Sequence, residues 1–344
     1  MGKKRGYTNR RGAVKGRKGK LKGTFGVLAL LCVLGIALFS QDEKLFREVL
    51  QELPEALEEA RTEAARAEAD ERTPAPPLEA SHMEVHFIDV GQGDASLIKC
   101  EDEAMLIDTG EASEEEALKG YLHNQGIEKL DYLVLTHPDL DHIGGAASLI
   151  EEFYIETVFM SDFEKDNQTY RSLIQTLDDK QLAWSTPEVG SSFMLGSARV
   201  TVLAPNREYS DPNNASVALR VENGNNSFLF TGDAEEEAEE DILANGFSVQ
   251  ADVYKAGHHG SRTASGEGFV DAVSPSFAVI SCGEDNSYGH PHAEPMNTFR
   301  ARGMKVFRTD EQGSIIAFSD GSEITWNCAP SETWKAGEPV GSAG

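Results

Sequence analysis

The chain has 344 residues, of which 40% are hydrophobic and 26% are charged, a size that allows one large domain with accessory segments or two small domains. The formal net charge of −27 is unevenly distributed, because residues 1–23 contain ten Lys or Arg and no acid, which leaves 21 basic against 58 acidic residues in the remainder. The four cysteines include no C-x-x-C pair, which argues against a thiolate zinc site; Cys100, Cys282 and Cys328 are compatible with one disulfide or with buried thiols.

The basic residues 1–23 lead into an uncharged apolar run, residues 24–40. About 17 residues is the short limit for a helix that crosses the hydrocarbon core of a membrane. A basic flank before an apolar run is typical of a cleaved signal peptide or an uncleaved signal anchor, and the positive charges favour the anchor. We therefore predict a cytoplasmic tip (1–23), a membrane segment (24–40) and an extracytoplasmic body, which is secreted if the signal is cleaved.

Residues 41–82 are predicted to form a charged helical stalk followed by a proline linker. Apolar residues from Leu45 to Leu57 recur at helical spacing, and prolines cluster between Pro74 and Pro77. The sequence changes character at Met83, where we place the start of the main domain.

From residue 83, short β-like runs alternate with turns and helical segments. Strands are predicted over residues 84–89, 95–99, 104–107, 130–136, 157–160, 198–203, 216–221, 227–231, 253–256, 277–281, 305–308 and 314–319. Helices are predicted over residues 114–125, 145–153, 168–180, 235–245, 266–273 and 295–302. Strands first in pairs and then interleaved with helices predict sheets covered by helices on their outer faces. The domain is predicted to end near residue 328, before a loose tail (329–344).

Residues 136–142 (THPDLDH) are the most informative segment of the chain. They contain four potential metal ligands, His137, Asp139, Asp141 and His142, directly after an apolar run at residues 133–135. A short apolar run that stops in a ligand-dense turn is typical of a buried strand that ends in a metal site.

In five other segments, ligand-type residues also follow an apolar run. They are residues 87–95, 106–110, 228–233, 255–261 and 286–292. Loops at strand ends are where a rigid scaffold usually displays catalytic groups. Each segment alone could be an ordinary turn, but their joint occurrence predicts a metal centre.

The order and content of these segments resemble the metallo-β-lactamase fold superfamily, and more closely the soluble hydrolase domain of the ComEC competence proteins. The motifs are DVGQGDA at 89–95, H-x-D-x-D-H-x-G-G at 137–145, TGD at 231–233, HHGS at 258–261 and N-x-Y-G-H-P at 286–291. The resemblance implies an α/β (α+β) domain over residues 83–328, a four-layer αββα sandwich with one or two metal ions at one edge of its two sheets.

The resemblance also implies roles for individual residues. The expected metal ligands are His137, Asp139, Asp141, His142, Asn214, Asp233, His258 and His290. Asp233 is expected to bridge two metals, and His258 is preferred to His259 by family position. Asn214 or Ser216 replaces a histidine that the common zinc pattern supplies in this interval. Asp141 is also expected to orient the attacking hydroxide, and Lys255 or Ser261 to stabilise an oxyanion.

Two departures from the common zinc pattern bear on the metal. Asp139 stands where that pattern has a second histidine, and no histidine occurs between His142 and Asp233. Because oxygen ligands favour harder ions, the site is expected to favour Mn²⁺ or Mg²⁺ relative to Zn²⁺, and Zn²⁺ stays an alternative.

The predicted function is a metal-dependent hydrolase, a ComEC-like phosphodiesterase or nuclease that acts on DNA or another phosphodiester through a metal-activated water. The acidic body weighs against DNA, because nucleic-acid binding depends on Lys and Arg that neutralise phosphates. Two alternatives stay open: a hydrolase of a non-nucleic-acid ester, and a surface-anchored binding module with a degenerate site.

Overall fold

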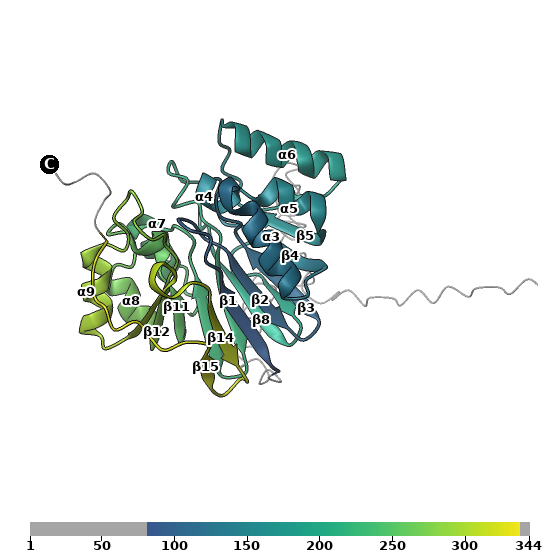
Figure 1. Cartoon of the computed structure of the whole chain (residues 1–344). Helices are drawn as coiled ribbons and strands as arrows, with labels where there is room; N and C mark the ends of the chain where they lie inside the picture. Colours follow the sequence, from purple (N-terminus) through teal and green to yellow (C-terminus); the bar gives the residue numbers. More distant parts are fainter. Residues whose placement is uncertain (1–80, 338–344) are drawn as a thin grey trace, which may run out of the picture. The chain divides into compact units, whose positions relative to one another are not determined.

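The computed structural model describes residues 81–337 (Figure 1). The predicted tip, the predicted membrane segment (24–40) and nearly all of the predicted stalk lie outside these residues. Within residues 81–337, no helix combines the length and the apolar composition that a membrane crossing requires. The first described strand begins at Met83 and the last ends at Trp326.

The first sheet has eight strands in the order β15-β14-β1-β2-β3-β4-β5-β6. The strands β3 to β6 run parallel to one another, whereas the other neighbours in this sheet pair antiparallel. Their bounds are β1 Met83–Phe87, β2 Ser96–Cys100, β3 Glu103–Ile107, β4 Lys129–Leu135, β5 Tyr154–Met160, β6 Trp184–Ser185, β14 Ile315–Ser319 and β15 Ile324–Trp326.

The second sheet has seven strands in the order β13-β12-β11-β10-β9-β8-β7. The strands β10 to β13 run parallel, and β7 to β10 pair antiparallel. Their bounds are β7 Ser192–Leu195, β8 Ala198–Ala204, β9 Ala218–Asn223, β10 Asn226–Phe230, β11 Val253–Lys255, β12 Phe277–Ile280 and β13 Lys305–Arg308.

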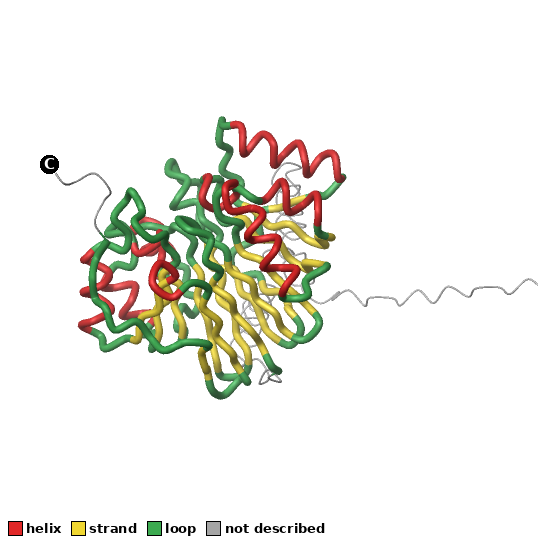
Figure 2. Tube along the Cα trace, in the orientation of Figure 1, coloured by secondary structure: helices red, strands yellow, loops and turns green. Residues whose placement is uncertain are grey.

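Helices cover the outer face of each sheet (Figures 1 and 2). The first sheet carries α3 Glu115–Asn124, α5 Ala146–Glu152 and α6 Gln168–Lys180, and the second carries α7 Glu236–Ala244, α8 Glu267–Val273 and α9 Ala293–Ala301. The remaining elements are short: α4 Leu140–Ile143, α10 Thr309–Gln312 and the 3₁₀ turns η1 Ala112–Glu114 and η2 Gly257–Gly260.

Strand β4 shows how the sequence produces the layers. Successive side chains of a strand point to opposite faces. Leu133 and Leu135 pack with the helices of the first sheet, whereas Val134 packs between the two sheets. The inner layer also contains Phe87 and Phe230, whose ring centroids lie 6.0 Å apart. A strand buried on both faces reads as a continuous apolar run, and the result is the predicted αββα sandwich.

Within the predicted main domain (83–328), every predicted strand and helix overlaps an element of the structure. The short strands β6, β7 and β15 were not predicted; they lie at sheet edges and depend on their neighbours for pairing. The helices α4 and α10 were not predicted either, because they are single turns with no hydrophobic periodicity to detect.

The segment that follows β15 differs from the loose tail that we predicted. The backbone N–H of Ser331 donates to the carbonyl oxygen of Val306, and the N–H of Gly337 donates to that of Pro291. Trp334 packs against the core beneath the second sheet's helices. As far as Gly337, the tail is therefore part of the packed domain.

Candidate metal centre

The candidate site lies where the carboxyl ends of parallel strands from both sheets meet. Each of these strand ends is followed by a polar residue of the site: Asp108 after β3, His137 after β4, Asp233 after β10, His258 and His259 after β11, and His290 after β12. Ligands of α/β proteins generally bind at the carboxyl ends of strands. Segments separated by more than 100 residues therefore converge here.

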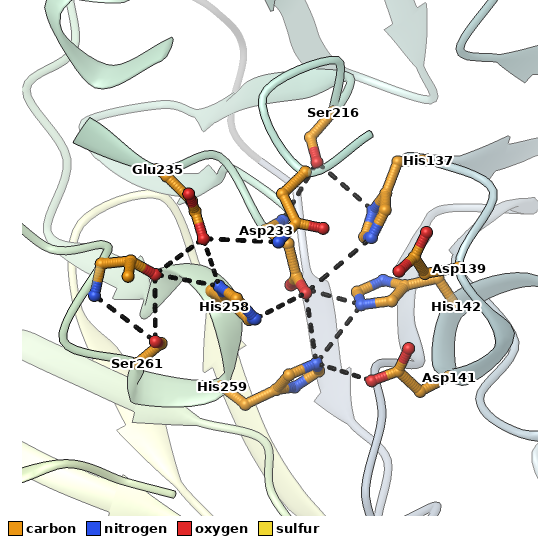
Figure 3. Close-up of polar contacts among 12 residues, drawn as sticks. His137, Asp139, Asp141, His142, Ser216, Asp233, Glu235, His258, His259 and Ser261 are labelled. Atoms are coloured by element: carbon orange, nitrogen blue, oxygen red, sulfur yellow. Dashed lines mark hydrogen bonds and ion pairs between the residues drawn. The ribbon is translucent and has the colours of Figure 1, made fainter. Parts of the chain in front are cut away.

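Asp233 lies at the centre of the cluster, with imidazoles around it (Figure 3). Its Oδ1 is 3.2 Å from Nε2 of His142. Its Oδ2 is 3.5 Å from Nε2 of His259 and 3.8 Å from Nε2 of His137. Asp141 completes the cluster, with Oδ2 3.3 Å from the same His259 nitrogen. A carboxylate surrounded in this way is placed to bridge two cations.

Three imidazoles present Nε2 to the centre because their Nδ1 atoms are engaged behind it. Nδ1 of His142 donates to Oδ2 of Asp108 at 2.7 Å, and Nδ1 of His259 donates to the carbonyl oxygen of Ser281 at 3.0 Å. Nδ1 of His137 contacts the hydroxyls of Thr136 at 3.1 Å and of Ser216 at 3.3 Å. Such outer partners fix the tautomer and ring orientation of metal-binding histidines.

Asp108 lies in the segment 106–110 that the sequence singled out, but it was not among the expected metal ligands. In the structure its carboxylate accepts hydrogen bonds from the backbone N–H and the hydroxyl of Thr136, both at 2.7 Å, in addition to that of His142. It therefore orients a site histidine from behind. The signal in the sequence was the Asp-Thr-Gly turn at the end of an apolar run.

The backbone of the site is strained at three non-glycine residues. Asp108, His258 and His259 have φ values of +60°, +48° and +54°, in the left-handed region that most side chains avoid. Each such residue costs of the order of 1–3 kcal/mol and persists only where the surroundings impose it. The strain at the two histidines directs both side chains toward Asp233.

The donor set fits a divalent cation. Among the described residues, Nε2 of His137 and Oδ1 of Asp233 are buried polar atoms without a hydrogen-bond partner. Groups of three ligand atoms within 4.8 Å of one another occur at His137, His142 and Asp233, and at Asp141, His142 and His259. Because unsatisfied buried polar atoms are rare, these two overlapping groups fit a site that could hold one or two ions.

The charges of the cluster agree with this fit. Burial and the nearby His142 lower the pKa of His137 to about 3, so that this imidazole is neutral and free to act as a ligand. Burial raises the pKa of Asp233, but the positive charges of His142 and His259 outweigh it and hold that pKa well below its usual range. Neutral imidazoles and ionised carboxylates are the forms that bind metals. Burial lowers the pKa values of His142 and His259, but the surrounding carboxylates, above all Asp233, outweigh it and raise both, that of His259 to about 10. These two imidazoles would therefore each release a proton when a metal binds.

Two predicted ligands are engaged elsewhere. Asp139 pairs with the ammonium group of Lys165 and belongs to none of the three-residue groups. The side-chain oxygen of Asn214 accepts hydrogen bonds from the backbone N–H of Glu235 (3.1 Å) and of Ala238 (3.2 Å), so that it caps the start of α7. In the interval where we expected Asn214 or Ser216, the serine is the residue that contacts a site histidine.

The adjacent histidines His258 and His259, of which we expected the first as a ligand, both present Nε2 to Asp233. His259 rather than His258 contacts Asp141, His142 and Asp233 together. His258 is more exposed; its Nε2 lies 3.7 Å from Oδ2 of Asp233, and its Nδ1 lies 3.1 Å from Oε1 of Glu235.

His290 stands one ring further out. It stacks on His259 with ring centroids 5.9 Å apart, and its Nδ1 is buried without a hydrogen-bond partner among the described residues. It lies beside the cluster and is in none of the three-residue groups.

The two residues predicted to stabilise an oxyanion have other partners. Nζ of Lys255 donates to Oδ2 of Asp94 at 2.8 Å, and both residues are buried behind His259. The hydroxyl of Ser261 lies 3.0 Å from that of Thr263, within the turn that carries the histidines. Both groups have partners within the fold, and these contacts support the loop.

The glycine-rich segment 89–95 packs directly against the short helix α4. The backbone N–H of Asp94 donates to the carbonyl oxygen of Asp141 at 3.1 Å. A Cβ on Gly93, whose φ is +145°, would lie 2.5 Å from that oxygen. Only glycine allows this close approach, which fixes the position of Asp141.

Comparison with known proteins agrees with the fold. Residues 88–284 match the model of the metallo-beta-lactamase superfamily. The chain is 33% identical over 260 residues to ComE operon protein 3 of Bacillus subtilis (strain 168), covering 70% of this chain and 33% of that protein. It is 33% identical over 231 residues to competence protein ComA of Neisseria gonorrhoeae, covering 66% of this chain and 31% of that protein.

The chain thus spans about a third of the length of these curated relatives. Among solved structures, the metallo-beta-lactamase fold protein YhfI from Bacillus subtilis aligns with a TM-score of 0.46 at 14% identity, covering 72% of this chain and all of that one. The family model matches more than half of the chain, and the chain belongs to the metallo-β-lactamase superfamily.

Proposed function

We propose that this protein is a metal-dependent hydrolase that cleaves phosphodiesters. The observation that carries the proposal is the convergence of three Nε2 atoms, from His137, His142 and His259, on the carboxylates of Asp141 and Asp233. His137 and Asp233 would hold one ion, and Asp141, His142 and His259 the other, with Asp233 between them. A bound divalent metal lowers the pKa of a coordinated water and offsets the charge of a phosphoryl group.

The protein's own residues supply orientation around that chemistry. Asp141 is placed to accept a hydrogen bond from the attacking water, since its pKa is held low: burial opposes ionisation, but the hydrogen bond from His259 and the charge of His142 outweigh it. Asp108 and Ser281 hold the imidazoles of His142 and His259 in register. These groups lose little freedom on substrate binding, because all are already fixed by packing.

The phosphodiester part of the proposal rests on two supports. The donor set has two carboxylates in place of additional imidazoles, which suits hard ions that bind phosphate oxygens. Relatives are named as a competence protein and as recombination protein 2 of Haemophilus influenzae, the latter 30% identical over 250 residues, with 30% of its length covered. Both names concern DNA, and we therefore place DNA first among the phosphodiesters to test.

The decisive experiment combines metal binding with turnover. Mn²⁺ and Zn²⁺ are titrated into the metal-free chain by calorimetry, and the loaded chain is incubated with single-stranded DNA, double-stranded DNA and bis-p-nitrophenyl phosphate. Asp141→Asn is the matched variant; we expect turnover to fall about a hundredfold or more with an unchanged circular dichroism spectrum, because the group that orients the water is lost.

Each negative result has a distinct meaning. Failure to bind either metal would leave a binding module with a degenerate site. Metal binding without hydrolysis of any of the three substrates would favour an ester that contains no phosphodiester. Full activity of Asp141→Asn would remove the role given to that carboxylate.

We also propose that residues 24–40 anchor the chain in a membrane with the hydrolase domain outside the cytoplasm. This rests on the sequence pattern alone. Protease added to intact cells should degrade the domain; protection of the domain in intact cells, with degradation after lysis, would place it inside.

A further inference from the structure

An exposed aromatic ring lies in the same loop as His290. Tyr288 follows β12 and is 58% exposed. Its ring stacks on that of His290 with centroids 5.5 Å apart and an interplanar angle of 16°. His290 in turn stacks on His259 at 27°. The three rings therefore form a stack from the surface to the candidate metal centre.

The loop holds this ring in a fixed place. The side-chain amide of Asn286 donates to the carbonyl oxygens of Gly283 (2.9 Å) and His290 (2.7 Å), and its oxygen accepts from the N–H of His290 (2.9 Å). These bonds close the loop on both sides of Tyr288. A pre-organised aromatic ring needs little ordering when a ligand binds to its free face.

Positive charge is scarce around the candidate metal centre. Lys165 is paired with Asp139, Lys255 is buried with Asp94, and the exposed Arg262 lies 3.8 Å from Glu294. A substrate that bound only through its phosphates would find few positively charged partners near the candidate metal centre.

We propose that Tyr288 is a stacking platform for a nucleobase beside the scissile phosphate, which makes an unpaired strand the preferred substrate. The inference rests on the proposed phosphodiesterase function and names its substrate class. Every base has a π-face, so that stacking on an aromatic side chain supplies affinity without positive charge. In a duplex both faces of an interior base are already covered, and the platform has nothing to hold.

The other exposed aromatic residues offer a control. Among the described residues, Tyr154 is 65% exposed and begins β5, at the amino end of that strand and away from the carboxyl edge that carries the site. Tyr154→Ala therefore removes an equivalent exposed ring without touching the candidate platform.

Binding is measured apart from turnover. The probe is a single-stranded phosphorothioate oligonucleotide with one 2-aminopurine, added to the Mn²⁺-loaded full chain while its fluorescence is followed. We expect quenching in the wild type, and a Kd about tenfold weaker, without quenching, in Tyr288→Ala. Tyr288→Phe should keep both signals, because the ring is retained, and Tyr154→Ala should match the wild type.

An oligonucleotide of the same length with abasic positions separates stacking from phosphate binding. The wild type should bind the abasic strand about tenfold more weakly than the intact strand. Tyr288→Ala should bind the abasic strand as weakly as the wild type does. Equal wild-type Kd values for intact and abasic strands, or no binding of either, would overturn the platform. Loss of hydrolysis with normal quenching would instead contradict the proposed function and leave the platform standing. Thermal unfolding of each variant checks that the fold is intact.

Discussion

Replacing Lys255 with methionine tests the buried ion pair behind the candidate metal centre. Its ammonium lies 2.8 Å from Oδ2 of Asp94, and the two residues are only 2% and 5% exposed. Methionine fills a similar volume and removes the charge. The change therefore leaves a carboxylate buried without its main counter-charge, a situation that proteins tolerate poorly.

The expected loss of stability is large, because the remaining charge stays buried and does not regain its hydration when its partner is removed. Breaking a buried pair by removing one member costs about 3–5 kcal/mol. The double variant Lys255→Met with Asp94→Asn carries no buried charge at this position, so that we expect it to recover part of the free energy of unfolding.

The pair also predicts an effect of pH. Burial raises the pKa of Asp94, but the charges of Lys255 and His259 outweigh it and hold that pKa below its ordinary value. A depressed carboxylate pKa gives stability that is present above the unfolded pKa of 3.8 and is lost as the pH falls below it. Without Lys255, the acid loss should begin at higher pH.

Urea unfolding of the full chain in EDTA, followed by circular dichroism at several pH values, measures these quantities. A loss below about 1 kcal/mol in Lys255→Met, the value of a surface pair, would refute the buried-pair reasoning. Unchanged stability with lost turnover would return Lys255 to the oxyanion role that the sequence suggested. A double variant no more stable than the single one would show that the lysine acts through packing.

Three further predictions concern the neighbouring residues. His259→Ala should weaken Mn²⁺ binding in calorimetry more than His258→Ala does, and the reverse order would make His258 the ligand. Gly93→Ala should lose more stability and activity than Gly91→Ala, since both have positive φ but only Gly93 is pressed against a backbone oxygen. Burial raises the pKa of Glu239 to about 7 from 4.5. Stability from this group is therefore lost as the pH rises through about 7; Glu239→Gln should flatten the change in urea midpoint between pH 5 and pH 8, and an unaltered slope would contradict this assignment.

The structure changes how the acidic composition bears on the binding of DNA. The few cations near the site are already paired, and an exposed tyrosine stands at its edge. A nuclease with such a surface would depend on bound metal and on stacking more than on a basic groove. Its affinity for DNA should accordingly fall less steeply with salt than that of a protein with many phosphate contacts.

The layers and the approximate place of the site could be predicted from the sequence. Apolar runs such as residues 133–135 are buried on both faces of a sheet, and that pattern can be read without coordinates because it depends only on neighbours along the chain. Glycines and ligand-type residues at strand ends likewise located Asp141, His142 and Asp233, which the structure brings into one cluster.

Which of two neighbouring side chains contacts the whole cluster depends on the tertiary structure. His258 and His259 are adjacent and chemically identical, and both have left-handed backbone angles, but only His259 contacts Asp141 and His142 as well as Asp233. Asn214 and Ser216 were equal candidates in the sequence, but in the structure the side chain of Asn214 accepts a hydrogen bond at the start of α7. Lys255 was a plausible oxyanion donor until Asp94, 161 residues away in the chain, provided its partner. Such choices depend on contacts between distant segments, which local pattern does not encode.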